Sequence, residues 1–348
     1  MKPAPEECPG RFLRACRLEA VDRTPVWFMR QAGRSLPEYR EIREKHDLVA
    51  ITQQPELCAE VTLQPVRRLG VDAAILFADI MTPLLGVGLD VRIVEHVGPV
   101  LDEPICRAED LERLRPLEPE QDVPYVLRTL QLLRTALPAE VGLIGFAGAP
   151  FTLASYLVEG RPSRTFARTK QLMYTAPALW AALMSRLAAI VSSYLAAQVQ
   201  AGAQVVQLFD SWAGCLSVHD YRAYVLPYSA QILRAVAGTG VPAIHFGTGT
   251  SAMLEAMREA GGDVIGVDWR IPLDVAWQRI GYDRGIQGNL DPLALMAPWD
   301  VLASACQRVL AQGQGHAGHV FNLGHGVDPS TSPDTLARVV RLVHGEDA

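Results

Sequence analysis

The sequence is poor in lysine and carries no excess of positive charge. Of its 32 basic residues only Lys2, Lys45 and Lys170 are lysines, and the formal net charge is -6. Without a broad positive field, the chain is not expected to bind nucleic acid or an anionic membrane surface. An anionic ligand must instead be bound by a local cluster of arginines.

Paired cysteines, a signal peptide and long apolar runs are also missing. The six cysteines include no Cys-x-x-Cys pair, which in a chain of 348 residues favours reduced thiols in a cytosol over a disulfide framework. The first residues contain no apolar segment of the kind that secretory signals need. The most apolar stretch, 176–194, is interrupted by Ser185 and Arg186 and has helical spacing. We therefore expect a cytoplasmic protein that does not interact with a membrane.

Short β-rich runs alternate with longer amphipathic segments along the whole chain. Strands are expected at residues 24–29, 72–77, 142–146, 204–209, 242–246, 264–267, 285–287 and 319–323. Amphipathic helices are expected between them, among others at 55–69, 165–200 and 292–311. Eight strands alternating with helices predict an α/β fold of the (β/α)8 TIM-barrel type, with an open doubly wound sheet as the alternative.

No internal repeat, low-complexity tract or linker divides the sequence, so we expect one catalytic domain over residues 1–348. The stretch 86–117 predicts a hairpin inserted after the second barrel strand. In a TIM barrel the active site lies at the C-terminal ends of the strands. A catalytic side chain should therefore follow closely on a strand.

The first predicted strand leads into a turn with two arginines, Arg30-Gln31-Ala32-Gly33-Arg34. Planar guanidinium groups suit bidentate recognition of carboxylates, and a glycine lets the backbone approach a ligand closely. A solvated charged loop is the ordinary alternative. The apolar run before the turn and its position at a strand end favour a carboxylate-binding site. We call residues 30–34 the arginine turn.

Other polar or aromatic side chains follow the remaining strands. Asp79 lies between apolar neighbours, where a carboxylate is costly unless it finds donors; bracing of its own loop is the alternative. The small residues of 145–150 are expected to leave room for a flat ligand, and Tyr156 follows them as a hydrogen-bond donor or a core residue. Phe209 and Ser211 end the fourth strand, and His325 lies in a glycine-rich turn where it should be more exposed than a core histidine.

Two further patterns are set aside. His316, His319 and His325 suggest a metal site, but 319 and 325 lie at opposite ends of a strand, too far apart to share an ion. Residues 247–250, Gly-Thr-Gly-Thr, suggest a phosphate cradle but lack the lysine and the spacing of a P-loop.

Together, the arginine turn, the 145–150 segment and Asn322-Leu323-Gly324-His325-Gly326 resemble the uroporphyrinogen decarboxylase family. The resemblance runs over essentially the whole chain. It implies a lyase of porphyrin and haem biosynthesis that needs no cofactor or metal. Such an enzyme removes the carboxyl groups of four acetate side chains from uroporphyrinogen III, giving coproporphyrinogen III. The resemblance also implies a TIM-barrel homodimer in the cytoplasm, with the site in a cleft at the barrel mouth.

The same resemblance assigns roles to individual residues. Asp79 is implied as the central catalytic aspartate, which accepts hydrogen bonds from pyrrole N–H groups. The substrate-binding residues are implied to be Arg30, Gln31, Ala32, Gly33, Arg34, Arg43, Tyr156, Phe209, Ser211 and His325. Ser35 departs from the family, which commonly has a tyrosine there, and this leaves the packing beside the arginine turn open.

Three questions stay open at this point. The proton that the reaction needs can come from Arg30, from a substrate carboxyl group or from ordered water, although the intrinsic pKa of arginine is high. A corrinoid methyltransferase of similar barrel fold is the alternative enzyme, but the zinc it needs usually takes a His-x-Cys string, and His245-Phe246-Gly247 holds no cysteine. A non-catalytic tetrapyrrole carrier is the alternative outside the enzymes.

Overall fold

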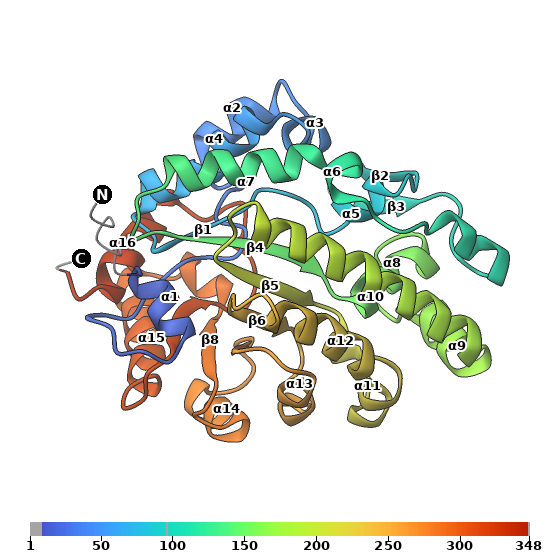
Figure 1. The fold of residues 1–348 in the computed structure, drawn as a ribbon. Helices are drawn as coiled ribbons and strands as arrows, with labels where there is room; N and C mark the ends of the chain where they lie inside the picture. The colour runs from blue at the N-terminus through green and yellow to red at the C-terminus, as the bar shows by residue number, and fades with distance from the viewer. Residues whose placement is uncertain (1–8, 95–96, 347–348) are drawn as a thin grey trace, which may run out of the picture.

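The centre of the computed structural model, which describes residues 9–94 and 97–346, is a curled parallel sheet of seven strands (Figure 1). Each strand pairs in parallel with the next, in the order β1 (Ala73–Ile75), β4 (Gly142–Gly148), β5 (Val205–Asp210), β6 (Ala243–Gly247), β7 (Val264–Gly266), β8 (Gly285–Leu290) and β9 (His319–Leu323). All seven overlap strands expected from the sequence. Nearly every residue in them is buried, as expected for parallel strands covered on both faces.

The segment 25–27 lies between β9 and β1, the two edge strands of this sheet. Phe321 N–H donates to Pro25 O at 2.8 Å, and Asp72 N–H donates to Val26 O at 2.9 Å. The expected strand at 24–29 is nevertheless reduced to a single bridge between Val26 and Phe321. Pro25 has no N–H, and the N–H of Val26 donates to the Asp72 side chain instead of a neighbouring backbone, so no regular ladder forms.

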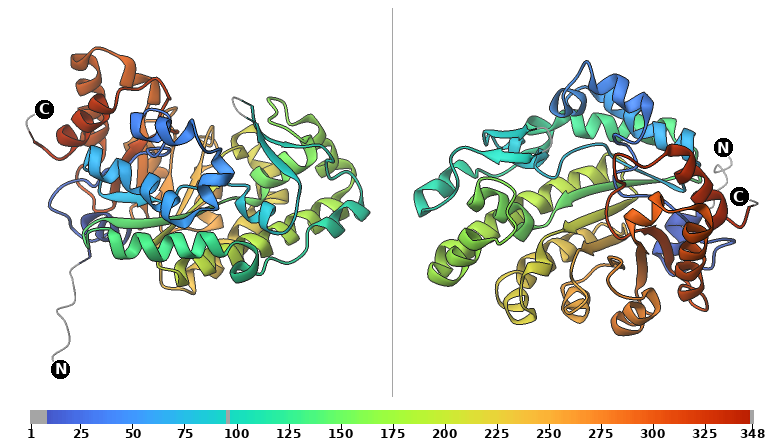
Figure 2. Two further views of the ribbon diagram at one scale, coloured as in Figure 1. Left: turned by 90° about the horizontal axis from the view of Figure 1, so that it is seen from above. Right: turned by 180° about the vertical axis from the view of Figure 1, so that it is seen from behind.

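The sheet is flanked by many helices, several of which pack on its outer face, as Figures 1 and 2 show. They are α1 (Arg11–Cys16), α2 (Pro37–Arg43), α3 (Leu48–Thr52), α4 (Pro55–Leu69), α5 (Thr82–Gly86), α6 (Pro119–Asp122), α7 (Pro124–Ala136), α8 (Pro150–Glu159), α9 (Ala167–Thr175), α10 (Pro177–Gln200), α11 (Val218–Tyr224), α12 (Leu226–Ala237), α13 (Leu254–Ala260), α14 (Leu273–Ile280), α15 (Trp299–Gln312) and α16 (Pro333–Val343). Short 3-10 helices lie at Ala108–Arg113, Ala213–Cys215 and Pro292–Met296.

The helix expected over 165–200 is two helices, α9 and α10, which break at Ala176. Pro177 disfavours the helical conformation of the residue before it, and Ala176 has φ -135° and ψ 61°. By length and composition α10 is apolar enough to cross a membrane, but half of its most apolar window is buried inside the protein. It packs against β4, α8 and α12, so its apolar face contributes to the core.

A second, two-stranded antiparallel sheet lies within the stretch 86–117. It pairs β2 (Val91–Val94) with β3 (Gly98–Leu101), in the register Val91 to Leu101. In Figure 1 this pair lies near α8, on the far side of the molecule from α1 and α16.

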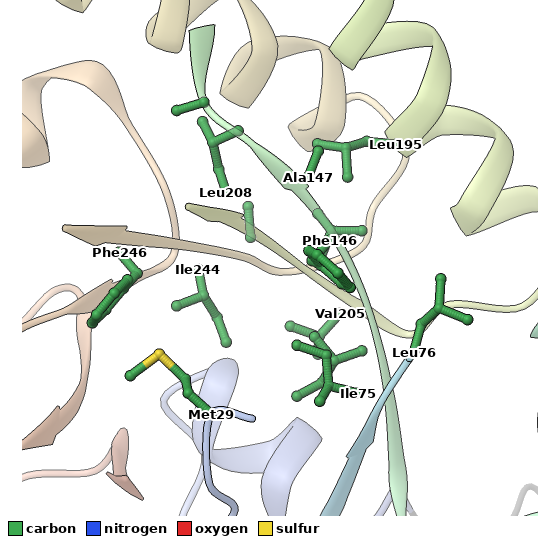
Figure 3. Packing of buried hydrophobic residues seen from close by; sticks show 14 of the residues in the cluster. Met29, Ile75, Leu76, Phe146, Ala147, Leu195, Val205, Leu208, Ile244 and Phe246 are labelled. Carbon is green, nitrogen blue, oxygen red and sulfur yellow. The ribbon is translucent and has the colours of Figure 1, made fainter. Parts of the chain in front are cut away.

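The core fills the space between helices and sheet and also the inside of the curled sheet. Figure 3 shows Met29, Phe146 and Ile244 among the buried side chains there. A fully buried polar chain crosses the same interior: Trp27 Nε1 donates to Gln287 Oε1 at 3.0 Å, and Gln287 Nε2 donates to Gln207 Oε1 at 3.2 Å. These two bonds give the buried Trp27 and Gln287 side chains partners and tie segment 25–27, β8 and β5 to one another.

Candidate active site

The residues expected to form the site lie at one end of the sheet, beyond the C-terminal ends of its strands. The arginine turn follows segment 25–27, Asp79 follows β1, and Tyr156 lies on α8 directly after β4. Phe209 lies near the end of β5 and His325 follows β9. The Arg30 side chain lies against Gly326, next to His325, and its charge lowers the pKa values of Asp79, Tyr156 and His325, which agrees with a shared location.

The arginine turn is braced by both neighbouring strands. Met29 N–H donates to Asn322 Oδ1 of β9 at 3.1 Å. The fully buried Gln31 side chain donates to Ala73 O of β1 at 2.9 Å and accepts from Phe28 N–H at 3.0 Å. Gln31 is therefore a brace. In the described residues the N–H groups of Ala32 and Gly33 donate to no acceptor, which leaves both for an anion.

Arg30 departs from ordinary backbone geometry. Its φ is +60°, a left-handed conformation that costs a residue with a side chain about 1 kcal/mol. Its side chain is exposed and crosses Gly326, where an added Cβ would lie 2.4 Å from Arg30 Cδ. Gly33 permits the turn, because a Cβ there would lie 2.9 Å from Arg30 O. Strained backbone and glycines at close approaches are typical of functional turns.

The two other arginines differ in their surroundings. Arg34 is half-buried within the turn. Arg43 lies at the end of α2, where its Nη1 donates to His46 O at 2.7 Å. That bond satisfies a carbonyl beyond the helix end, so at least part of the Arg43 guanidinium has a structural role.

Of the two carboxylate oxygens of Asp79, one accepts a hydrogen bond from the described part of the chain and the other does not. Oδ1 accepts from Met81 N–H at 2.8 Å, which is the loop-bracing role considered above. Oδ2 accepts from no residue in the described part of the chain, and the side chain is only half-buried. Burial raises the pKa of Asp79, against the opposing effects of the Met81 N–H and the Arg30 charge. Donors from a ligand would relieve this cost.

Aromatic rings form the wall beside Asp79. Tyr156 packs against Trp212 with ring centroids 4.1 Å apart and ring planes tilted by 38°, and burial together with the charge of Asp79 raises the pKa of its phenol. The phenol therefore stays protonated and can donate a hydrogen bond. Phe209 meets Phe146 and Phe246 edge to face, with centroids 5.5 and 5.7 Å away.

Strand alternation decides which β5 side chains face this site. Gln207 points into the curled sheet, so Phe209, two residues further along the same strand, points the same way. The Ser211 carbonyl accepts from the Thr248 hydroxyl at 2.5 Å, whereas its own Oγ bonds to no described residue. Asp210 points to the opposite side and is fully buried, with Oδ2 3.8 Å from Nε2 of the buried His245.

His325 is a neutral donor. Gly326 N–H donates to its Nδ1 at 2.7 Å, so the ring proton is assigned to Nε2. Burial, reinforced by the charges of Arg30 and Arg270, lowers the pKa of His325 from 6.5 to about 4. It is half-buried, whereas His245 and His319 are buried, which agrees with the exposure expected from the sequence.

The expectation of open space at 145–150 is wrong, whereas setting aside the 247–250 loop agrees with the structure. An added Cβ at Gly145 would lie 2.5 Å from Gln198 Oε1, and one at Gly148 would lie 2.9 Å from Leu153 Cδ2. Protein side chains thus fill the space expected to hold a flat ligand. Gly249 N–H donates to the buried Asp268 carboxylate at 2.6 Å, so the 247–250 loop does not offer that group to a phosphate.

Comparison with known sequences decides the family. The family model described as "Uroporphyrinogen decarboxylase (URO-D)" matches residues 9–346. The chain belongs to the uroporphyrinogen decarboxylase family. Proteins named uroporphyrinogen decarboxylase from Sorangium cellulosum and Salinispora tropica are 58% and 57% identical to it. Each alignment covers 96% of this chain, together with 95% and 89% of the relative.

Two solved structures of similar fold carry names from outside the uroporphyrinogen decarboxylase family. A methyltransferase from Methanosarcina mazei superposes with a TM-score of 0.76 at 19% identity, covering 96% of this chain and 97% of its own. A B12-independent methionine synthase from Shewanella has a TM-score of 0.56 at 10% identity, covering 86% and 88%. At these identities the likeness extends to the fold alone. In the described residues, no group of three His, Cys, Asp or Glu side chains could hold a metal ion.

One further side chain at the C-terminal end of the sheet strands was not expected from the sequence. Arg270 follows β7, and its charge reaches His325. The requirement that a site residue follow a strand would have selected it. Sequence alone, however, gave no reason to separate it from the many exposed arginines.

Proposed function

We propose that this chain is a uroporphyrinogen decarboxylase that converts uroporphyrinogen III to coproporphyrinogen III without a cofactor. The main support for the proposal is the match of the uroporphyrinogen decarboxylase family model to residues 9–346. The grouping of an arginine turn, an aspartate with a free oxygen and a neutral histidine donor at one sheet edge supports it. These groups suit a ligand with N–H donors at its centre and carboxylates at its rim.

Asp79 is the residue to which we assign the central catalytic role. Its free Oδ2 accepts hydrogen bonds from the pyrrole N–H groups, which supply the donors that the half-buried carboxylate lacks. When a pyrrole ring is protonated at carbon, the ring becomes a cation, and a carboxylate in a water-poor site stabilises that charge as it develops.

The reaction then follows from the charge on the ring. The bond between the acetate CH2 and its carboxylate breaks, CO2 leaves, and the bonding electrons pass into the cationic ring. A proton adds to the resulting exocyclic CH2 and the ring proton is lost, which leaves a methyl group. Each acetate thus takes up one proton and releases one CO2. We leave the proton donor open between Arg30, a substrate carboxyl group and water.

The remaining site residues bind and orient the substrate in this proposal. Arg30 and Arg34, with the N–H groups of Ala32 and Gly33, bind carboxylate arms. Gln31 acts through the turn that it braces, and Arg43 assists from α2. Other contacts to the macrocycle come from Tyr156, Phe209, Ser211 and the Nε2–H of His325.

We also propose that the chain forms one domain, in which segment 25–27 serves as the eighth barrel strand and the β2–β3 pair is an insertion. Residual structure in an isolated half of the chain would argue against one cooperative domain.

A homodimer in the cytoplasm is proposed from the resemblance. Sedimentation equilibrium that gives the mass of a single chain would contradict the dimer, and fractionation into membranes would contradict the location.

The test is an anaerobic incubation of the purified protein with uroporphyrinogen III, followed by oxidation and chromatography of the products. We expect coproporphyrin to accumulate. Recovery of uroporphyrin alone, from a protein that binds the substrate, would instead identify a carrier. Stoichiometric zinc in the purified protein would favour the methyltransferase alternative.

A further inference from the structure

Arg270 lies at the same end of the sheet as the arginine turn, on a different loop. It follows β7 after Asp268 and Trp269. Its Nη1 donates to Asp268 Oδ2 at 2.5 Å, and its guanidinium lies 4.1 Å from the centroid of the Trp269 ring. The side chain is 51% exposed, and its Nε and Nη2 form no hydrogen bond with a described residue. Half of the guanidinium is thus held while the other half is free.

The support behind Arg270 is buried and rigid. Asp268 has only 2% of its surface exposed and also accepts from Gly249 N–H at 2.6 Å. Asn289 of β8 donates to Asp268 O at 3.0 Å and to Ile271 O at 2.7 Å. Three neighbouring strands therefore fix the position of this one arginine. An ordinary surface ion pair, such as Arg67 with Glu60, joins two exposed side chains and has no such support.

The loop that carries Arg270 packs directly against the turn that carries His325. A Cβ on Gly324 would lie 2.5 Å from Trp269 N, and a Cβ on Gly326 would lie 2.4 Å from Arg30 Cδ. The 324–326 turn is therefore flanked by residues 268–270 on one side and by Arg30 on the other. The charges of both arginines reach the histidine between them, which agrees with this placement.

We propose that Arg270 binds a substrate carboxylate on the other side of His325 from Arg30. The inference rests on the proposed function, because it needs a ligand with carboxylates on several sides. Uroporphyrinogen carries carboxylate arms on all four pyrroles, so one arginine turn cannot meet them all. A guanidinium whose orientation is already fixed loses little side-chain entropy when it binds.

The experiment compares Arg270→Ala, Arg270→Lys and the control Arg67→Ala in steady-state turnover of uroporphyrinogen. Arg67→Ala removes the same charge from an exposed ion pair in the last turn of α4, which leads into the N-terminal end of β1, the opposite end of the sheet from Arg270. We expect Arg270→Ala to raise KM about tenfold, equivalent to about 1.4 kcal/mol, with a much smaller change in kcat. Arg270→Lys should recover part of the loss, and the control should behave as the wild type.

A binding measurement separates this inference from the proposed function. Uroporphyrin, the oxidised macrocycle with all its carboxylates, is titrated into each variant and followed by fluorescence. We expect Arg270→Ala to raise its Kd about tenfold. Active wild-type protein with unchanged KM and Kd in Arg270→Ala would overturn the inference alone, as would a loss confined to kcat. Wild-type protein without turnover would overturn the proposed function instead.

Discussion

The side chain of Arg30 lies across the backbone of Gly326, so one residue near the start of the chain is positioned by another near its end. Both residues are constrained by this contact. Arg30 adopts a left-handed backbone, and Gly326 has no room for a Cβ beneath the arginine.

Gly326→Ala should therefore displace Arg30 without disturbing the core. An added Cβ would lie 2.4 Å from Arg30 Cδ, 2.7 Å from Cγ and 3.1 Å from Cβ, so the arginine must change rotamer and its backbone must shift. We expect kcat/KM to fall about tenfold or more and Tm to fall by no more than about 4 °C. Gly315→Ala is a matched control for glycine loss, since no atom lies near its Cβ position, although its positive φ adds some strain. Unchanged kcat/KM in Gly326→Ala would show that the position of Arg30 does not matter.

Asp79→Asn should separate activity from stability. Burial raises the pKa of Asp79, so its charged form is disfavoured in the folded state and any stabilising effect belongs to low pH and is lost as the pH rises. A neutral Asn that keeps the acceptor for Met81 N–H should thus match or exceed the wild type in free energy of unfolding near neutral pH.

Turnover by the same variant should fall about a hundredfold, because the amide cannot stabilise a cationic ring. Asp79→Ala, which also loses the loop brace, should be more severely impaired. Any stability gain of Asp79→Asn should shrink as the pH approaches the ordinary aspartate value of 3.8. Denaturant unfolding and single-turnover assays measure the two effects. Near-normal turnover by Asp79→Asn would remove the electrostatic role.

The lowered pKa of His325 should make the folded protein less stable as the pH falls. Its pKa is lowered to about 4 in the folded protein, from 6.5. Between these values the unfolded chain binds a proton that the folded protein does not, so the free energy of unfolding falls as the pH drops. The upper limit is about 1.4 kcal/mol per pH unit.

His325→Gln should reduce this loss but leave the part due to His319, whose pKa is also lowered to about 4 by burial. Comparing Tm at about pH 7.5 and about pH 5 checks the prediction. A steeper loss of Tm in His325→Gln than in the wild type would have the wrong sign.

Substitution of the buried Ser35 should stabilise the protein. It is 4% exposed, and within the described residues its buried Oγ has no hydrogen-bond partner. An unsatisfied buried hydroxyl costs about 1 kcal/mol or more, so Ser35→Ala should raise the free energy of unfolding by about that amount. Thr62→Val should do the opposite, because the Thr62 hydroxyl donates to Cys58 O and accepts from Phe77 N–H. Destabilised Ser35→Ala would indicate a partner for that hydroxyl.

The seven sheet strands could be predicted from the sequence because each is a short, largely apolar run buried on both faces. The arginine turn and Asp79 could be predicted because they follow such runs. Segment 25–27 could not be assigned correctly, since its irregular pairing depends on where one N–H finds its acceptor, the distant Asp72.

Other features depend on which neighbour a side chain meets. The small residues at 145 and 148 suggested open space, yet the helix α10 and Leu153 occupy it. The role of Arg270 depends on the burial of Asp268 and on the packing of Trp269 against Gly324, neither of which leaves a local signature. The sequence likewise does not show that Met81 N–H occupies Asp79 Oδ1 and leaves Oδ2 available.

The bond from Met29 N–H to Asn322 Oδ1 joins residues 293 positions apart. During synthesis the arginine turn therefore emerges from the ribosome long before the strand that braces it. A nascent chain that lacks β9 has neither Asn322, which braces Met29, nor His325, which follows it, so it should remain unable to bind porphyrinogen. Protease sensitivity around residue 30 in ribosome-bound chains should disappear only after β9 has emerged. Early protection of that region would mean that β1 alone holds the turn.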